Sequence, residues 1–180
     1  DEIIVADSHS TDGTSEIAEN LGAKVIHINF NGYGDLRNQA ISYCKGDWIF
    51  SLDSDERCTE KVRDEILSLI KDASLDIYRI PRKNYFMGRW IKHSGWYPNF
   101  RQPQLFKNGK MSYDLKPVHE GYISHSDKKI GVIKNAIWQF PFKNAEEIIS
   151  KTNRYSTLGV AKLQDKGENG SVFKAFLHGL

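Results

Sequence analysis

The stretch Asp47-Trp48-Ile49-Phe50-Ser51-Leu52-Asp53-Ser54-Asp55-Glu56 decides how the chain is expected to fold. Residues 47–52 are mostly apolar and predict a short buried strand, so the acidic residues emerge together at its C-terminal end. Residues i and i+2 of an extended segment point to the same side, and Asp53 and Asp55 can therefore face one cation or one polar ligand. Two carboxylates this close repel each other unless positive charge lies between them. A divalent ion that keeps positions open for phosphate oxygens suits the pair, although many surface turns also contain a D-x-D pattern.

Strands and helices alternate through the first half of the chain. The apolar patterns and capping residues predict strands at 3–6, 24–28 and 47–52 and helices at 14–21, 34–44 and 59–71. This order predicts an α/β fold with a mostly parallel, Rossmann-like sheet flanked by helices. Ligands bind beyond the C-terminal strand ends of such sheets, and Asp7 and Asp53 both follow predicted strands there.

The second half of the chain has a different character. Residues 76–142 are rich in aromatic residues, Gly and Pro, which predicts irregular strands and loops, and residues 144–162 return to a helical pattern. We interpret this part as an elaboration of the same sheet, so that the 180 residues form a single domain. Its expected parts are a ligand-binding half (1–75), an irregular half (76–142) and a C-terminal helical segment (143–180).

Composition excludes several classes of protein. A net charge of +2 is too weak for a typical nucleic-acid-binding surface. The two cysteines, Cys44 and Cys58, have no metal-binding spacing, and reduced thiols in a cytosolic protein are the default. No signal peptide and no apolar run long enough to span a bilayer is present. The chain enters directly in a strand and stops inside an amphipathic pattern, so we expect it to be cut at both ends.

Two polar groups in the first half have both a structural and a functional interpretation. Asp7 leads a turn to a helix N-terminus, where it can cap the helix or accept hydrogen bonds from a base or ribose. Arg37 and Asn38 follow a glycine-punctuated loop, and Arg37 can be solvated or can bind phosphate through its planar guanidinium.

Two further groups lie in the second half. His119 can be a hydrogen-bonded structural residue or a metal ligand, and the adjacent Glu120 is the better candidate for a general base. Trp96 and Tyr97 cluster near Arg101, and such rings with polar neighbours either stack on carbohydrate or pack an irregular core.

Taken in order, the motifs of the first half resemble family 2 glycosyltransferases of the GT-A fold. These motifs are Asp7-Ser8-His9-Ser10-Thr11-Asp12-Gly13-Thr14, Gly32-Tyr33-Gly34 with Arg37-Asn38, and Leu52-Asp53-Ser54-Asp55-Glu56. The later stretches 86–98 and 118–120 look like the inner-core lipopolysaccharide glucosyltransferase branch of that family. The resemblance extends over nearly the whole chain and loosens after Phe140.

The resemblance implies roles for the residues of the first half. Asp7 is expected to contact the nucleotide base and ribose, with Arg37 and Asn38 beside the nucleotide. Asp53 is expected near the ribose and the metal, and Asp55 is expected to ligate a Mg²⁺ or Mn²⁺ ion that bridges the donor diphosphate.

The resemblance also implies the reaction and its setting. An inverting transfer is expected from a UDP-sugar, with glucose as the sugar, to a lipid-linked saccharide of the lipopolysaccharide core. Glu120 is the expected catalytic base, and Trp96, Tyr97, Arg101 and His119 are the expected acceptor-binding residues. The enzyme is expected to be cytoplasmic, with peripheral contact at the inner face of the bacterial inner membrane.

We expect the chain to depart from the family pattern in four places. The opening strand that ends in an Asn-Glu pair and the basic C-terminal part are both missing. Gln104 stands where relatives carry Arg, and Trp138-Gln139 stands where relatives often carry a His. Two alternatives therefore stay open. A nucleotidyltransferase would share the sheet and the paired carboxylates but would normally carry a Gly-rich, basic loop after its first strand. An inert fragment or a binding module for nucleotide sugars is the second alternative.

Overall fold

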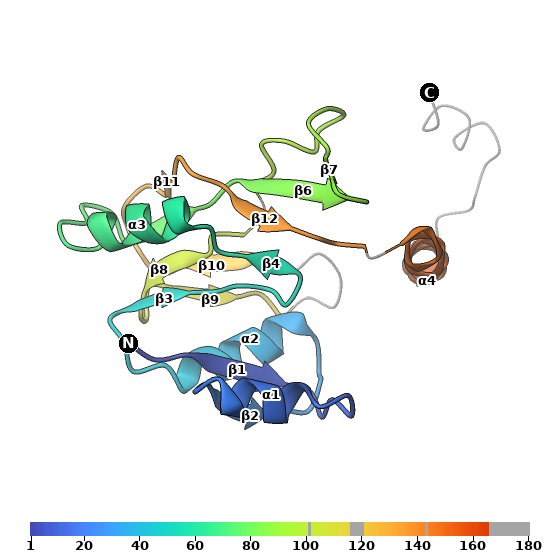
Figure 1. The fold of residues 1–180 in the computed structure, drawn as a ribbon, viewed down its shortest axis with the longest axis horizontal. Coiled ribbons are helices and arrows are strands. Elements are labelled where there is room, and N and C mark those ends of the chain that lie inside the picture. The colour runs from blue at the N-terminus through green and yellow to red at the C-terminus, as the bar shows by residue number, and fades with distance from the viewer. Residues whose placement is uncertain (101, 116–120, 143, 166–180) are drawn as a thin grey trace.

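The computed structural model describes residues 1–100, 102–115, 121–142 and 144–165 (Figure 1). Helices and strands alternate in the first part, and short strands joined by turns follow. In chain order the elements are β1 (Ile4–Asp7), α1 (Thr14–Asn20), β2 (Lys24–His27), α2 (Tyr33–Ser42), β3 (Trp48–Phe50), β4 (Glu56–Arg57), α3 (Glu60–Leu69), β5 (Ile77–Arg79), β6 (Arg82–Phe86), β7 (Arg89–Trp90), β8 (Leu105–Lys107), β9 (Met111–Tyr113), β10 (Tyr122–Ser124), β11 (Gly131–Val132), β12 (Ile137–Gln139) and α4 (Ala145–Asp165).

The first two strands form a parallel pair, as the alternating pattern predicts. β1 and β2 run side by side with Asp7 opposite His27, and α1 connects them along the chain. The helix ends just before Gly22, whose φ of +86° is a left-handed conformation that glycine adopts at little cost. The strand–helix–strand order is confirmed here, with nearly the predicted bounds.

The third strand, β3, pairs differently from the prediction. It lies antiparallel to β8 in a sheet of order β11–β5–β8–β3, with Ile49 opposite Phe106. Leu105 and Phe106 of β8 are fully buried between β5 and β3, and burial of these apolar side chains stabilises the antiparallel arrangement. The α/β class is confirmed, but the sheets are mixed where a mostly parallel sheet is predicted.

The region predicted to be irregular contains further short strands. A four-stranded sheet of order β4–β12–β6–β7 combines antiparallel and parallel pairs, and β9 pairs antiparallel with β10. These strands are two to five residues long, which is too short to leave a clear alternating pattern in the sequence.

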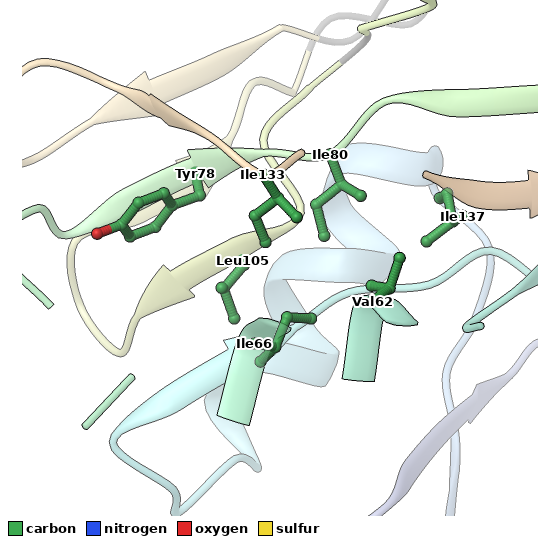
Figure 2. Close-up of a cluster of buried hydrophobic side chains, with 7 residues drawn as sticks. All are labelled: Val62, Ile66, Tyr78, Ile80, Leu105, Ile133 and Ile137. Carbon is green, nitrogen blue, oxygen red and sulfur yellow. The ribbon is translucent and has the colours of Figure 1, made fainter. Parts of the chain in front are cut away.

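Helix α3 packs on the sheet β11–β5–β8–β3 through one apolar stripe (Figure 2). Its N-terminus is capped by Thr59, whose hydroxyl accepts a hydrogen bond from Val62 N at 3.3 Å. Val62 and Ile66, one turn apart, contact a buried cluster drawn from β5, β8, β12 and the segments beside them. Each such side chain contributes about 1.5–3 kcal/mol by leaving water.

Helix α2 joins the β1–β2 pair to the rest of the molecule, because it contacts both β1 and β9. The approach to the end of β9 depends on Gly34, where an added Cβ would lie 2.1 Å from Asp114 O. The Asn38 amide completes this junction: Nδ2 donates to Tyr113 O and Oδ1 accepts from Tyr113 N, both at 2.8 Å. These contacts fix the position of α2 against the end of β9.

Among the described residues, no helix has an apolar stretch long enough to cross a lipid bilayer.

Candidate active site

The two aspartates that follow β3 lie in one tight turn. Glu56 N donates to Asp53 O at 2.9 Å, and Asp53 N donates back to the Glu56 carboxylate at 3.0 Å. Ser54 and Asp55 form the turn itself. Asp53 therefore precedes the turn and Asp55 is part of it, whereas the sequence prediction assumed an extended backbone with both carboxylates on one side. We call residues 53–56 the acidic turn.

Asp53 is paired with Arg37 of helix α2. Arg37 Nη2 donates to Asp53 Oδ1 at 2.7 Å, and neither side chain is fully buried. The guanidinium of Arg37 also lies 5.2 Å from the ring centre of Tyr113 and 5.7 Å from that of Tyr33. The structure thus brings together Arg37 and Asp53, two of the residues that the sequence singles out. The guanidinium is held at the first residue of the acidic turn.

A buried network that the sequence reasoning missed supports the acidic turn from behind. The Glu56 carboxylate accepts from Arg82 Nε at 2.5 Å and from Gln104 Nε2 at 2.7 Å, and all three side chains are buried. Burial raises the pKa of Glu56, and the Arg82 charge opposes this shift. Glu56 could have been found from the sequence, because it directly follows the D-x-D pattern. Its partners Arg82 and Gln104 lie 26 and 48 residues away, and nothing local in the sequence indicates them.

Asp55 contacts strand β12. Gln139 Nε2 lies 3.2 Å from one Asp55 carboxylate oxygen and 3.5 Å from the other, and Phe140 N donates to Asp55 O at 2.8 Å. The backbone of Asp55 is therefore held firmly while its carboxylate accepts one long amide contact. Gln139, like Glu56, was not among the predicted site residues.

Asp7 lies at the C-terminal end of β1 and is 4% exposed. Its carboxylate accepts hydrogen bonds from Ser10 N and from Ser15 Oγ, both at 3.0 Å, and from the Ser10 hydroxyl. The bond from the Ser10 hydroxyl is the largest cause that lowers the pKa of Asp7, and His27 at 3.5 Å adds to it. Asp7 therefore holds the loop before α1 and does not cap the helix, because the N-cap residue is Gly13 and no side chain caps it. The predicted capping role is wrong, and the nucleotide contact stays a prediction.

The other predicted site residues either have contacts elsewhere in the fold or lie outside the described residues. The Asn38 amide is engaged with the backbone of Tyr113, as described above. Trp96 is partly exposed, and Tyr97 packs edge-to-face on Trp90 with 5.1 Å between ring centres. Arg101, His119 and Glu120 lie outside the described residues.

The acidic turn offers the carboxylates of Asp53 and Asp55 to a divalent ion. Across the described ranges, no three His, Cys, Asp or Glu side chains converge as a metal-binding group. Mg²⁺ is commonly bound by one or two carboxylates together with substrate phosphates and water, rather than by an all-protein cage. Asp53 and Asp55 are carboxylates of the kind that such a site uses, and Arg37 is already paired with Asp53, so ion binding at the turn stays a prediction.

An α/β sheet with an acidic turn at the carboxyl end of a buried strand is the arrangement expected of a GT-A domain. The chain belongs to glycosyl transferase family 2, whose family model matches residues 1–125. An uncharacterized glycosyltransferase of Rickettsia felis is 31% identical over 97% of this chain and 65% of its own length. The lipopolysaccharide core biosynthesis glycosyltransferase LpsC of Rhizobium meliloti is 29% identical over 96% of this chain and 66% of its own length.

Solved structures agree on the fold. Staphylococcus aureus TarS 1–349 in complex with UDP superposes with a TM-score of 0.58 at 19% identity, over 77% of this chain and 51% of that one. The predicted family and fold class are therefore confirmed. The chain spans about 65% of the length of the Rickettsia relatives that it matches.

Proposed function

We propose that the protein is an inverting glycosyltransferase that moves a sugar from a UDP-sugar to a lipid-linked saccharide of the lipopolysaccharide core. Glucose is the sugar that we assign. The observation that carries the proposal is the acidic turn with Arg37 on Asp53 at 2.7 Å, because it combines two carboxylates and one cation where a strand ends. The likeness to LpsC supports the core saccharide as acceptor, and the UDP complex of TarS supports the nucleotide.

In this proposal the residues of the acidic turn orient the donor diphosphate. Asp53 and Asp55 would hold a Mg²⁺ or Mn²⁺ ion, and Asp7 would face the base and ribose with Arg37 and Asn38 beside the nucleotide. When bound, the ion supplies charge stabilisation to the leaving diphosphate. Arg37 adds a second positive charge at the same oxygens, and such preorganised charge is typically the largest electrostatic contribution to catalysis.

The acceptor side completes the proposed site. Glu120 takes the proton of the attacking hydroxyl, and that oxygen displaces the nucleotide in line, so the anomeric configuration changes from α to β. Trp96, Tyr97, Arg101 and His119 are assigned to the acceptor. For a lipid-linked acceptor we place the protein in the cytoplasm, with peripheral contact at the inner face of the bacterial inner membrane.

A donor screen with the full-length protein tests the proposal. UDP-glucose, other UDP-sugars, ADP-glucose and a GDP-sugar are incubated with Mn²⁺ and core saccharide, and release of the free nucleoside diphosphate is measured. We expect acceptor-dependent release of UDP, and Glu120→Gln should retain UDP binding while it loses transfer. In a parallel reaction with UTP and glucose 1-phosphate, release of pyrophosphate would instead indicate a nucleotidyltransferase. A protein that binds no UDP at all would contradict the proposal.

A further inference from the structure

The sheet β4–β12–β6–β7 carries a second polar face that the proposed reaction does not use. In the register of its strands, Trp138 of β12 lies opposite Arg57 of β4 on one side and opposite Lys83 of β6 on the other. The next residue, Gln139, lies opposite Glu56 and forms part of the buried row behind the acidic turn. Because side chains alternate along a strand, the row Arg57–Trp138–Lys83 faces away from that buried row.

A pocket of about 710 Å³ opens on this outer face. Its walls come from β4, the first turn of α3, β6 and β12, and its volume lies in the range of roughly 300–1,000 Å³ that is typical of small-molecule sites. The pocket is lined by three cations, Arg57, Lys61 and Lys83, and by one carboxylate, Glu60. Within the described part of the chain, none of the three cations forms an ion pair, and Lys83 Nζ lies 4.4 Å from the ring centre of Trp90.

Aromatic rings form the other part of the pocket. Trp138 is 42% exposed and Phe140 is 40% exposed, so both rings reach solvent in the lining of the pocket. Tyr85 supports both from the adjacent strand, with ring centres 5.5 Å from Trp138 and 5.3 Å from Phe140. The two exposed rings are thus held in place by packing. A fixed, open aromatic surface suits the apolar C–H face of a sugar ring.

We propose that this pocket binds an anionic saccharide unit, one that carries a phosphate or a carboxylate. The aromatic rings provide the stacking surface, and Arg57, Lys61 and Lys83 provide the charge for the acidic group. Thr59 and Asn135, also in the lining, are suitable partners for hydroxyl groups.

The pocket is joined directly to the acidic turn through two of its wall residues. Arg57 Nη1 donates to Ser54 O at 3.0 Å and to Glu56 O at 2.8 Å. Phe140 N donates to Asp55 O at 2.8 Å. An occupant of the pocket therefore touches residues that fix the backbone of the turn. We assign to the pocket a unit of the acceptor that lies some distance from the reacting hydroxyl. This assignment rests on the proposed function.

Binding of free monosaccharides in the absence of donor tests the pocket. Glucose 6-phosphate, glucuronate, neutral glucose and inorganic phosphate are titrated into the protein and followed by calorimetry. We expect both acidic sugars to bind at least about tenfold more tightly than glucose or phosphate, because only they engage both the rings and the cations. Binding of the acidic sugars should also weaken as salt is added.

Variants locate the binding site. Trp138→Ala and Lys83→Gln should each weaken binding of glucose 6-phosphate about tenfold, whereas Lys129→Gln, the same charge change at an exposed residue outside the pocket, should leave it unchanged. Lys83→Gln keeps the test valid should Trp138→Ala fail to fold.

Three outcomes would overturn the pocket proposal. They are equal affinity for glucose and its phosphate, binding that Lys83→Gln leaves intact, and Lys83-dependent binding to phosphatidylglycerol vesicles without binding of either acidic sugar. Because these titrations contain no donor, their result is independent of UDP release. Failure of the pocket and failure of the transferase proposal are therefore distinguishable.

Discussion

Arg37 Nη2 lies 2.7 Å from Asp53 Oδ1, so an ion pair connects helix α2 to the acidic turn. Both side chains keep contact with solvent, and a partly exposed pair of this kind contributes only about 0–1 kcal/mol to stability. The Tyr33 and Tyr113 rings beside the guanidinium hold it at the turn without neutralising it. The arrangement therefore serves to position a charge more than to stabilise the fold.

The first prediction follows from this geometry. Arg37→Lys retains the charge but loses the planar fork that binds phosphate through two bonds, so we expect transfer to fall by about 10²-fold. The free energy of unfolding should change by less than about 1 kcal/mol. Steady-state UDP release and urea unfolding measure the two quantities. Unchanged kinetics would mean that Arg37 serves only to fix Asp53.

Asp55 gives the second prediction. Asp55→Asn keeps the size of the side chain and the backbone bond from Phe140, but it removes the negative charge. We expect transfer to fall by about 10²–10³-fold and the response to Mn²⁺ to disappear, with little change in unfolding. The matched control is Asp72→Asn, at an exposed position outside the site. Full activity in Asp55→Asn would contradict the metal role.

The first half of the fold could be predicted because its signals are local. Apolar runs and capping residues near the ends of β1, α1 and β2 lie within a few residues of the elements that they define. The pairing of β3 with β8 depends instead on residues more than fifty positions apart, such as Ile49 and Phe106. Periodicity shows which face of a strand is buried but not which strand lies beside it. The alternation of strands and helices was therefore the remaining guide, and it predicted a mostly parallel sheet.

The residues of the site also divide into those that the local sequence indicates and those that it does not. Asp53 and Asp55 are recognisable because the strand and the carboxylates are adjacent in the chain. Arg82 and Gln139 reach the acidic turn from distant strands, and each is a polar residue in a short strand with no local sign of its partner. The sequence therefore indicated the aspartates of the acidic turn but not the distant residues that hold the turn in place.

A third prediction concerns acid stability and does not involve the site. Asp76 is buried and contacts Lys107 Nζ at 3.0 Å, Ser126 Oγ at 2.8 Å and Lys128 Nζ at 3.3 Å. The Lys107 bond is the largest cause that lowers the pKa of Asp76 from 3.8 to about 2. Its stabilising contribution is therefore complete above the unfolded pKa of 3.8 and is lost as pH falls toward about 2.

Asp76→Asn tests this dependence. The variant should be less stable than the parent at neutral pH, and the difference should shrink as pH falls from about 4 to about 2. Urea unfolding at a series of pH values measures it, with Asp127→Asn, an exposed position, as the control. A difference that stays constant over this range would exclude ionisation of Asp76 as the cause.

The last prediction separates support of the acidic turn from its chemistry. Glu56 is buried with Arg82, and Glu56→Gln would leave the Arg82 charge without its carboxylate, which costs about 3–5 kcal/mol. The double variant Glu56→Leu with Arg82→Met removes both charges, and we expect it to regain much of that stability because apolar groups can replace a buried pair. Asp53 N would still lack its acceptor in the double variant. UDP binding should therefore stay weak although the fold is restored. Chemical unfolding and UDP calorimetry on both variants check this, and recovery of UDP binding together with stability would show that Glu56 matters for the fold alone.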